Sequence, residues 1–325
     1  MKALTLAAGV SCVAFAAAAE TPVLTVLTYD SFTSEWGPGP AVEQAFEATC
    51  GCDLRFVTGG DGAALLARLQ LEGASTDIDV VLGLDTSLTA AAAETGLFVP
   101  HGQPAAKGLP VAYDDPLFLP YDWGWFAFVY DKARLPTPPE SFTDLAISDV
   151  KIVIQDPRSS TPGLGLLLWV KAAYGDNAAD IWSGLADNIV TVTPGWSEAY
   201  GLFLAGEADM VLSYTTSPAY HRIAEQDDGK DWAPFAEGHY LQVEVAGMLA
   251  NSDQLALATA FLAFSQTAEF QTLIPETNWM YPVGDTPLPD GFETAQPAVT
   301  LMMTGAEALA ARAPALAEWQ AALAQ

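Results

Sequence analysis

Short β-rich runs alternate with helical segments in two series along the chain, and this alternation constrains the fold more than any other feature. The first series predicts strands over 24–29, 53–57 and 78–84, with helices over 38–48 and 63–72 and another ending at Glu94. The second series predicts strands over 151–154, 189–193 and 209–213, with helices over 163–174 and 197–205. Alternation with short loops is typical of parallel sheets joined by right-handed crossovers, so we predict an α/β protein with two lobes.

Two extended segments flank the second series and set the predicted division of the chain. Residues 118–130 stand between the two series and residues 240–245 follow the second, so we expect a two-strand hinge between the lobes. The mainly helical segment 253–325 has Ala- and Leu-rich amphipathic stretches, which we expect to pack on the first lobe. The predicted division is a leader at 1–19, lobe 1 at 20–128 and 240–325, and lobe 2 at 129–239.

The first nineteen residues have the pattern of a secretory signal peptide. Lys2 supplies a positive charge, residues 3–16 are mostly small and apolar, and three alanines precede Glu20 as a cleavage site. Cys12 falls inside this leader, and the three residues before it lack the Leu that is usual before a lipid-modified cysteine. We therefore expect export to the periplasm without a lipid anchor, and a mature chain that begins near Glu20.

The chain is strongly acidic, with 40 Asp and Glu against 12 Lys and Arg and a formal net charge of −28. Such a field repels phosphate backbones and anionic lipid surfaces, which excludes nucleic acid as a partner. The simplest interpretation of the charge is a solvated surface that keeps an exported monomer dispersed, and steering of a cationic ligand is the alternative. No stretch after the leader approaches about 18 uninterrupted apolar residues, the length of a membrane span.

Cys50 and Cys52 are the only cysteines that remain once the leader is removed. In an oxidising compartment they can pair only with each other, and Gly51 between them supplies the backbone freedom that so small a ring needs. We favour a structural disulfide over free thiols. Catalysis or metal binding by these cysteines is disfavoured, because nothing in the surrounding sequence would activate a thiol.

Polar loops follow the predicted strands, and ligands of open α/β sheets bind there because the carboxyl ends of the strands meet. Two such loops of the second lobe carry hydroxyls beside helix N-termini, namely Ser160-Thr161 and Thr215-Thr216-Ser217. Backbone N–H groups and the helix dipole stabilise anionic oxygens at these positions. Ser and Thr also cap helices generally, so a phosphate subsite and plain capping both remain open.

Aromatic side chains provide a second chemistry at the predicted site. Tyr29, Trp196 and Tyr220 stand in loops that follow strands, and Trp279 lies in a turn near the C-terminal helices. Trp169, by contrast, lies in an apolar helix and is expected in the core. Electron-rich ring faces near a carboxylate favour a desolvated organic cation, each good contact contributing roughly 0.5–2 kcal/mol. The pattern therefore predicts a small organic cation as the ligand.

Eight sequence runs stand in one order along nearly the whole mature chain. These runs are TYDSF at 28–32, WGPGP at 36–40, DVVLGLD at 79–85, QDPRSSTPGLGLLLW at 155–169, GWSEAYGLFL at 195–204, LSYTTSPAYH at 212–221, EGHYLQVEVA at 237–246 and NWMYPV at 278–283. Together they resemble the periplasmic thiamine-binding proteins of bacterial thiamine importers. The resemblance implies a two-lobed type II periplasmic-binding fold with an interlobe ligand cleft. It also implies that thiamine and its mono- and diphosphate are captured for an inner-membrane permease that a cytoplasmic ATPase drives.

The resemblance further implies which residues contact the ligand. The family's contacts fall on matching positions, namely Asp61, Gly62, Ser160, Thr161, Trp196, Tyr214, Thr215, Thr216 and Ser217, with Tyr29, Tyr220 and Trp279 as aromatic contacts. Asp61 is either the acidic partner of the cation or the acceptor for the pyrimidine amine, and the sequence does not separate these roles. Thiamine is then a transported cargo, and the protein is expected to be no enzyme and to need no cofactor or metal.

Three rival functions share this fold or a similar one. A ferric-ion binder needs a cluster of tyrosinates, carboxylates and His, but Tyr214 and Tyr220 have no adjacent tyrosine pair. A thiaminase needs a cysteine nucleophile with a base, but Cys50 and Cys52 are expected away from the cleft. A polyamine binder would use several cleft carboxylates and aromatics, with little need for the hydroxyl loops.

Overall fold

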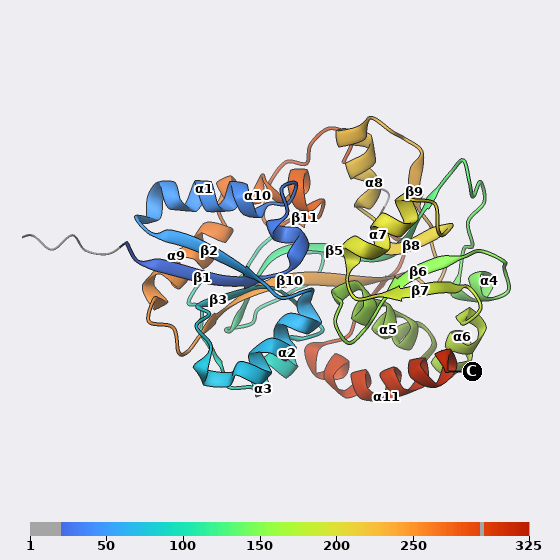
Figure 1. The fold of residues 1–325 in the computed structure, drawn as a ribbon, viewed down its shortest axis with the longest axis horizontal. Coiled ribbons are helices and arrows are strands. Elements are labelled where there is room, and N and C mark those ends of the chain that lie inside the picture. The colour runs from blue at the N-terminus through green and yellow to red at the C-terminus, as the bar shows by residue number, and fades with distance from the viewer. Residues whose placement is uncertain (1–20, 293–295, 325) are drawn as a thin grey trace, which may run out of the picture.

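The structure is a computed structural model that describes residues 21–292 and 296–324, and it has two lobes (Figure 1). The predicted signal peptide at 1–19, with Cys12, lies outside the described residues. One twisted sheet runs through both lobes in the strand order β2-β1-β3-β10-β5-β8-β6-β7, and four short strands pair with its central members. The α/β class predicted from the sequence is confirmed.

The first lobe begins with the first predicted series. Its strands are β1 (Val23–Thr28), β2 (Asp53–Thr58), β3 (Val80–Asp85) and β4 (Phe98–Val99). Its helices are η1 (Asp30–Thr33), α1 (Gly39–Cys50), α2 (Gly62–Glu72), η2 (Gly73–Ser75) and α3 (Thr89–Glu94). β1 lies between β2 and β3 and is parallel to both. α2 packs on β3 and buries Leu65, Leu66 and Leu69, the face that the sequence predicts, because these side chains recur at helical spacing.

The second lobe contains the second predicted series. Its strands are β6 (Ile152–Gln155), β7 (Ile189–Thr193), β8 (Met210–Tyr214) and β9 (Lys230–Trp232). Its helices are α4 (Phe142–Ala146), α5 (Thr161–Tyr174), η3 (Gly175–Asn177), α6 (Ala178–Leu185), α7 (Trp196–Leu204), α8 (Ser217–Tyr220) and η4 (His221–Glu225). β6 is parallel to both β7 and β8, so loops rich in polar residues leave the same edge of the sheet.

Two long strands join the lobes. β5 (Phe118–Asp131) pairs with β10 (His239–Leu249) in antiparallel register, with Gln242 opposite Gly124 and Glu244 opposite Asp122. Farther along, β5 pairs with β8 of the second lobe, while β10 pairs with β3 of the first. Both strands are buried along almost their whole length, which explains their continuous apolar sequence. The sheet therefore passes from one lobe to the other on these two strands.

The C-terminal segment is divided between the lobes. Its elements are α9 (Leu255–Ser265), α10 (Ala268–Gln271), η5 (Ile274–Asn278), β11 (Tyr281–Pro282), β12 (Thr300–Leu301) and α11 (Gly305–Leu323). α9 and α10 pack against α1 of the first lobe, as predicted. α11 instead packs mainly against α5 and α6 and touches α3 only near its start (Figure 1). The expectation that all of 253–325 packs on lobe 1 is therefore wrong for α11, because its apolar face covers α5 and α6 instead.

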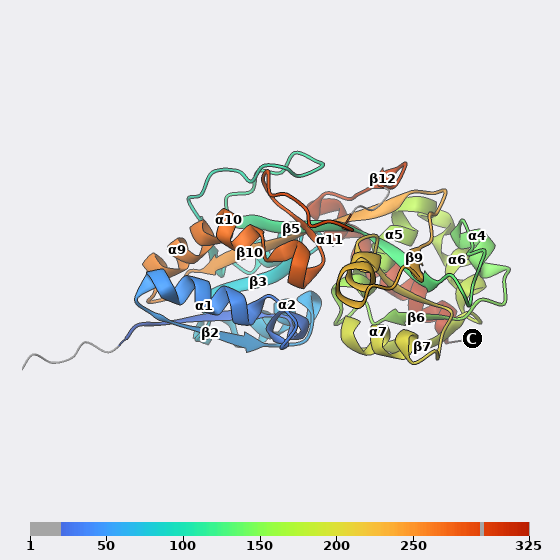
Figure 2. The same cartoon turned by 90° about the horizontal axis from the view of Figure 1, so that it is seen from above.

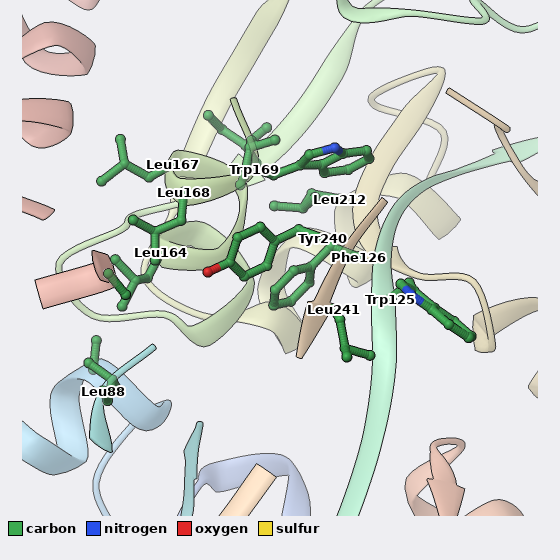
Figure 3. Close-up of a cluster of buried hydrophobic side chains, with 14 of the residues drawn as sticks. Leu88, Trp125, Phe126, Leu164, Leu167, Leu168, Trp169, Leu212, Tyr240 and Leu241 are labelled. Carbon is green, nitrogen blue, oxygen red and sulfur yellow. The ribbon is translucent and has the colours of Figure 1, made fainter. Parts of the chain in front are cut away.

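The core is continuous across the hinge strands. Figure 3 shows Leu164, Leu168 and Trp169 of α5 beside Phe126 of β5 and Tyr240 of β10, all of them fully or almost fully buried. Burial of each such side chain contributes roughly 1.5–3 kcal/mol. The prediction that Trp169 belongs to the core is confirmed. A view from above shows helices on both faces of the sheet (Figure 2).

A search of the described residues for membrane-spanning helices finds none with enough length and apolar character.

Candidate functional site

A cavity of about 280 Å³ lies between the two lobes, beyond the carboxyl ends of β1, β6 and β8. Ligand sites of open α/β sheets occupy this position because the loops after the strands converge there. The residues that line it are Tyr29, Ser31, Trp36, Asp61, Thr161, Pro162, Trp196, Ser197, Tyr200, Gly201, Leu204, Tyr214, Ser217, Tyr220, Glu244, Asn278, Trp279 and Met280. These described lining residues include seven aromatic side chains and two carboxyl groups, but no lysine, arginine or histidine.

One side of the cavity is formed by stacked rings of the second lobe, which we call the aromatic wall: Trp196, Tyr200 and Tyr220. Trp196 is the first residue of α7, and Tyr200 follows one turn later, so their rings stack with centroids 4.9 Å apart. The Trp196 indole Nε1 donates a hydrogen bond of 2.8 Å to Ser213 Oγ. Behind the wall, Tyr200 Oη and His221 Nε2 are 2.9 Å apart. These bonds hold the rings in place in the absence of ligand.

Two tryptophans face the aromatic wall from outside the second lobe. The ring centroid of Trp36 lies 6.2 Å from that of Trp196, and Trp279 makes an edge contact of 5.4 Å with Tyr220. Trp279 has a φ of 56°, a left-handed conformation that costs an L-residue about 1–2 kcal/mol. Such conformations persist where the surrounding structure holds them, often beside functional sites. Trp36 and Trp279 therefore each bring a ring from outside the second lobe into contact with the aromatic wall.

Three buried carboxyl groups lie together on the strands beside the cavity, and we call them the acid floor: Asp85, Asp122 and Glu244. They lie on adjacent strands in register, because Glu244 of β10 is paired with Asp85 of β3 and with Asp122 of β5. Only Glu244 among them lines the cavity. Burial raises the pKa of Glu244 to about 7, although the hydrogen bonds from Tyr121, Tyr29 and Gln242 act in the opposite direction. Burial beside the Glu244 carboxyl group raises the pKa of Asp85 to about 7.

Hydroxyl and amide donors surround Glu244. Tyr29 Oη donates to Glu244 Oε2 at 3.0 Å, Tyr121 donates to the same oxygen, and Gln242 Nε2 donates to Oε1 at 2.8 Å. The ring of Tyr29 packs against Gly83, where an added Cβ would lie 2.3 Å from a ring carbon. Gly83 also has a φ of 112°, which side chains rarely adopt. The position of Tyr29, and with it this hydrogen bond, therefore requires glycine at 83.

Asp61 joins the two lobes. Its Oδ2 accepts hydrogen bonds from Ser160 Oγ at 2.8 Å and from the Trp196 backbone N–H at 3.1 Å. The neighbouring Gly62 N–H donates to Thr161 Oγ1 at 3.0 Å. We call this set of contacts the interlobe latch. An added Cβ on Gly62 would lie 2.6 Å from Thr161 Oγ1, so only glycine allows the lobes to approach this closely.

The N-termini of three helices meet at the interlobe latch. Asp61 is the N-cap of α2, Ser160 is the N-cap of α5, and Trp196 begins α7. Helix N-termini stabilise negative charge, so the Asp61 carboxylate stands where an anion is favoured. Burial nevertheless dominates and raises the pKa of Asp61 to about 6, while the bonds from Ser160 and Trp196 act in the opposite direction. In this structure Asp61 is a contact between lobes.

The predicted ligand-binding residues fall into two groups. Those that line the cavity are Tyr29, Asp61, Thr161, Trp196, Tyr214, Ser217, Tyr220 and Trp279. Gly62 and Ser160 lie just behind the lining, in the interlobe latch. Thr215 and Thr216 do not line the cavity, because both are fully buried and the Thr216 hydroxyl points to the Met280 sulfur at 3.9 Å. The second hydroxyl loop therefore presents Ser217 alone among its three hydroxyls.

Several lining residues were not predicted. Trp36 stands in the WGPGP run and Tyr200 lies one helical turn after Trp196, so helical spacing was a usable signal for Tyr200. Asn278 immediately precedes Trp279, and its Nδ2 donates to Asp122 at 2.7 Å. Glu244 was the strongest missed signal, since a single acid inside a buried apolar strand needs partners.

The cysteines and the candidate metal ligands lie outside the cavity lining. Cys50 and Cys52 form a disulfide at the C-terminal end of α1. Among the described residues, His221, Glu225 and Asp227 place ligand atoms within 4.8 Å of one another. Both ring nitrogens of His221 already have partners, since Nδ1 lies 2.6 Å from Glu225 and Nε2 contacts Tyr200. The arrangement is explained as support for the aromatic wall.

Comparison with known proteins agrees with this architecture. Residues 35–272 match the model of the bacterial extracellular solute-binding protein family. The chain is 55% identical over 306 residues to the thiamine-binding periplasmic protein of Escherichia coli strain K12, covering 93% of this chain and 94% of that protein. It is 52% identical to the thiamine-binding periplasmic protein of Brucella abortus, over 92% of this chain and 91% of that protein.

Solved structures show the same fold. A periplasmic thiamin binding protein superimposes with a TM-score of 0.92 at 52% identity, covering 95% of this chain and 98% of that chain. A ferric binding protein from Campylobacter jejuni superimposes with a TM-score of 0.74 at 17% identity, over 92% and 99% of the two chains, which shows a shared fold alone. The two-lobed fold, the interlobe cavity and these matches together place the chain in the family of bacterial extracellular solute-binding proteins.

Proposed function

We propose that this chain is the periplasmic subunit of an ABC importer that captures thiamine, together with its mono- and diphosphate. The relatives that match it over nearly their whole length are named for thiamine binding and for the periplasm. The cavity supports the same proposal, because aromatic side chains and buried carboxyl groups line it together and the described lining contains no basic side chain. This combination favours a desolvated organic cation, which is the observation that carries the proposal.

Each part of the ligand has a proposed place. The thiazolium and pyrimidine rings would lie between the aromatic wall and the Trp36 and Trp279 rings. The hydroxyethyl or phosphate end would face Thr161 and Ser217, the first residues of α5 and α8. An ionised Asp61 would repel a phosphate at this place. To admit one, Asp61 would have to give up the hydrogen bond that it accepts from Ser160, or become protonated. A monomeric chain would deliver the ligand to an inner-membrane permease with its cytoplasmic ATPase.

The rival functions fit the described site less well. Tyrosinate ligands for ferric iron require deprotonation, but burial raises the pKa of Tyr214 far above its ordinary value. The cysteine nucleophile of a thiaminase is absent from the described lining, since Cys50 and Cys52 are bonded to each other outside it. The family itself consists of solute-binding proteins and not of enzymes.

Calorimetric titration of the purified protein tests the proposal. We expect one thiamine to bind per chain and to quench tryptophan fluorescence, because Trp196 and Trp279 line the cavity. Thiamine monophosphate and diphosphate are titrated in parallel, and spermidine and ferric citrate serve as controls for the polyamine and iron alternatives. Absence of binding by all three thiamine forms, or stronger binding of either control, contradicts the proposed function.

A further inference from the structure

Two carboxyl groups oppose each other on the strands that join the lobes. Glu244 of β10 is the register partner of Asp122 of β5, and the pairing shifts at the next residue, between Glu244 and Val245. Side chains of directly paired residues in an antiparallel ladder lie on the same face, with Cβ atoms about 4.5–5.5 Å apart, so the two carboxyl groups are neighbours. Both residues are buried, with exposed fractions of 0% for Asp122 and 6% for Glu244. Two carboxylates cannot hydrogen-bond to each other without a proton between them.

The remaining contacts of the pair leave a place for that proton. Asp122 Oδ2 accepts from Asn278, while Asp122 Oδ1 is buried and has no hydrogen-bond partner in the described structure. Glu244 uses its oxygens to accept from Tyr29, Tyr121 and Gln242. A buried, unpartnered carboxyl oxygen is costly when charged, and a shared proton removes both the second charge and the unpaired contact.

The groups that face the pair do not supply a compensating cation. The titratable groups around it are Tyr29 after β1, Asp61 before α2, Asp85 in β3, Tyr121 in β5 and Tyr214 in β8. None of these groups is a cation near neutral pH. Burial and the negative charge of Asp61 favour retention of the proton by the pair, and these effects outweigh the hydrogen bonds from Tyr29 and Tyr121, which act in the opposite direction. The pair titrates as a unit, because its two members interact strongly.

We infer that Asp122 and Glu244 together hold one proton in the ligand-free cleft and release it to solvent when an organic cation binds against Glu244. This inference rests on the proposed function, since it takes the transported ligand to be the cation. Glu244 reaches the cavity lining, so a bound positive charge acts on the pair at short range. The proton leaves through the cleft, and no bond other than the O–H bond is broken.

The release of a proton gives the affinity a definite dependence on pH. Linkage requires that the ligand binds more tightly as pH rises wherever binding releases a proton, by about tenfold per pH unit for one full proton. The release is largest where the free pair is protonated and the liganded pair is not. Burial holds the pKa of both members above the ordinary carboxyl range, with Glu244 at about 7. The affinity for thiamine should therefore rise between about pH 6 and pH 7 and then level off.

A proton inventory on the intact protein tests the inference. Thiamine is titrated calorimetrically at pH 6.5 in phosphate, imidazole and Tris-type buffers, whose heats of ionisation differ. The slope of the observed heat against the ionisation heat counts protons, and we expect release of about half to one proton per ligand. Binding with no proton released overturns the inference and leaves the proposed function standing. Binding of no thiamine at any pH overturns the proposed function instead.

Isosteric variants locate the proton. In Asp122→Asn and in Glu244→Gln an amide N–H replaces the shared proton, so the protons released should fall close to zero whatever the change in affinity. Asp53→Asn removes one exposed carboxylate of β2 and should keep the wild-type release. Asp61→Asn tests the other titrating group of the cavity. Loss of the release in Asp61→Asn, with retention in Asp122→Asn, assigns the proton to Asp61 and overturns the inference. The wild-type inventory stands on its own if a variant fails to fold.

Discussion

The aromatic wall and the acid floor both contribute side chains to the same cavity, yet they are built in opposite ways. The wall comes from a short stretch of sequence, in which Trp196 and Tyr200 are one helical turn apart and Ser213 fixes the indole. The floor comes from three strands that are distant in sequence, and only their register brings Asp85, Asp122 and Glu244 together. The wall thus supplies shape through local structure, whereas the floor supplies charge through the tertiary fold.

The aromatic wall and the acid floor should also contribute differently to ligand binding. Stacking and cation–π contacts depend on ring faces that are already in place, so the wall should serve every form of a cationic ligand. The floor holds groups whose charge depends on pH and on the ligand itself, because burial competes with ionisation. The interlobe latch at Asp61 lies between the two regions and connects them when the lobes are closed.

Gly83→Ala should disrupt the acid floor and leave the aromatic wall intact. The added Cβ would lie 2.3 Å from a Tyr29 ring carbon at a φ of 112°, so Tyr29 must leave its bond to Glu244. We expect the free energy of unfolding in urea to fall by about 2–4 kcal/mol from overpacking and backbone strain. The matched control is Gly201→Ala, which lines the cavity on α7 and whose Cβ meets nothing within 4 Å. Equal stability of the two variants would contradict this account of Tyr29.

Asp61→Asn removes the carboxyl group of the interlobe latch and so tests the contribution of that group separately from the aromatic wall and the acid floor. Burial raises the pKa of Asp61 from its ordinary value of 3.8 to about 6 in the folded protein, so the folded state favours the protonated acid. The wild type should therefore lose unfolding free energy relative to Asp61→Asn as pH rises from about 4 to about 6, by up to about 3 kcal/mol.

Denaturant titrations of both proteins at several pH values between 4 and 8 measure this difference. Asp85 and Glu244 are present in both, so their own pH dependence largely cancels. A difference in unfolding free energy that stays constant across the range would show that Asp61 is ionised normally in the folded protein.

Ser217→Ala tests which end of the ligand lies near the hydroxyl loops. If Ser217 bonds to a phosphate, its loss should weaken thiamine diphosphate by about 1.5–3 kcal/mol and thiamine itself by about 0.5–1.5 kcal/mol. Thr216→Val removes a neighbouring hydroxyl that does not line the cavity and should leave both affinities unchanged. Equal losses for the two ligands in Ser217→Ala, measured calorimetrically, would place the phosphate elsewhere.

Trp196→Ala should weaken the wall for all three thiamine forms by similar factors. The expected loss is roughly 0.5–2 kcal/mol of binding free energy per ligand, from the missing ring face. Trp36→Ala should cost less, because Trp36 is 51% exposed and rests on one side of the cavity only. Unchanged affinity in Trp196→Ala would show that the ligand does not bind at the aromatic wall.

The sequence was sufficient to predict what depends on local patterns. The strands at β2, β3 and β7 and the helices at α2 and α5 lie within two residues of their predicted bounds, because apolar periodicity and turn residues mark them directly. The loops that line the cavity are predicted in the same way, because the bounds of a strand also determine which residues follow it. Eight predicted ligand contacts, Tyr29 and Trp196 among them, line the cavity for this reason.

The remaining features depend on tertiary structure. Glu244 and Asp122 appear in the sequence as isolated acids in apolar strands, and their meeting follows from the register of β5 against β10. The orientation of Thr215 and Thr216 into the protein interior depends on how the loop after β8 turns. Residue types alone do not determine either feature, because a shift of one residue reverses the face that a strand presents.

Because α11 packs on the second lobe, the distance between the two ends of the described chain depends on the separation of the lobes. β1 begins in the first lobe and α11 ends against α5 and α6 of the second, so the two ends of the described chain travel with different lobes. They lie at opposite extremes of the long axis (Figure 1). A pair of fluorescent labels, one near each end, therefore senses the separation of the lobes without any probe inside the cleft.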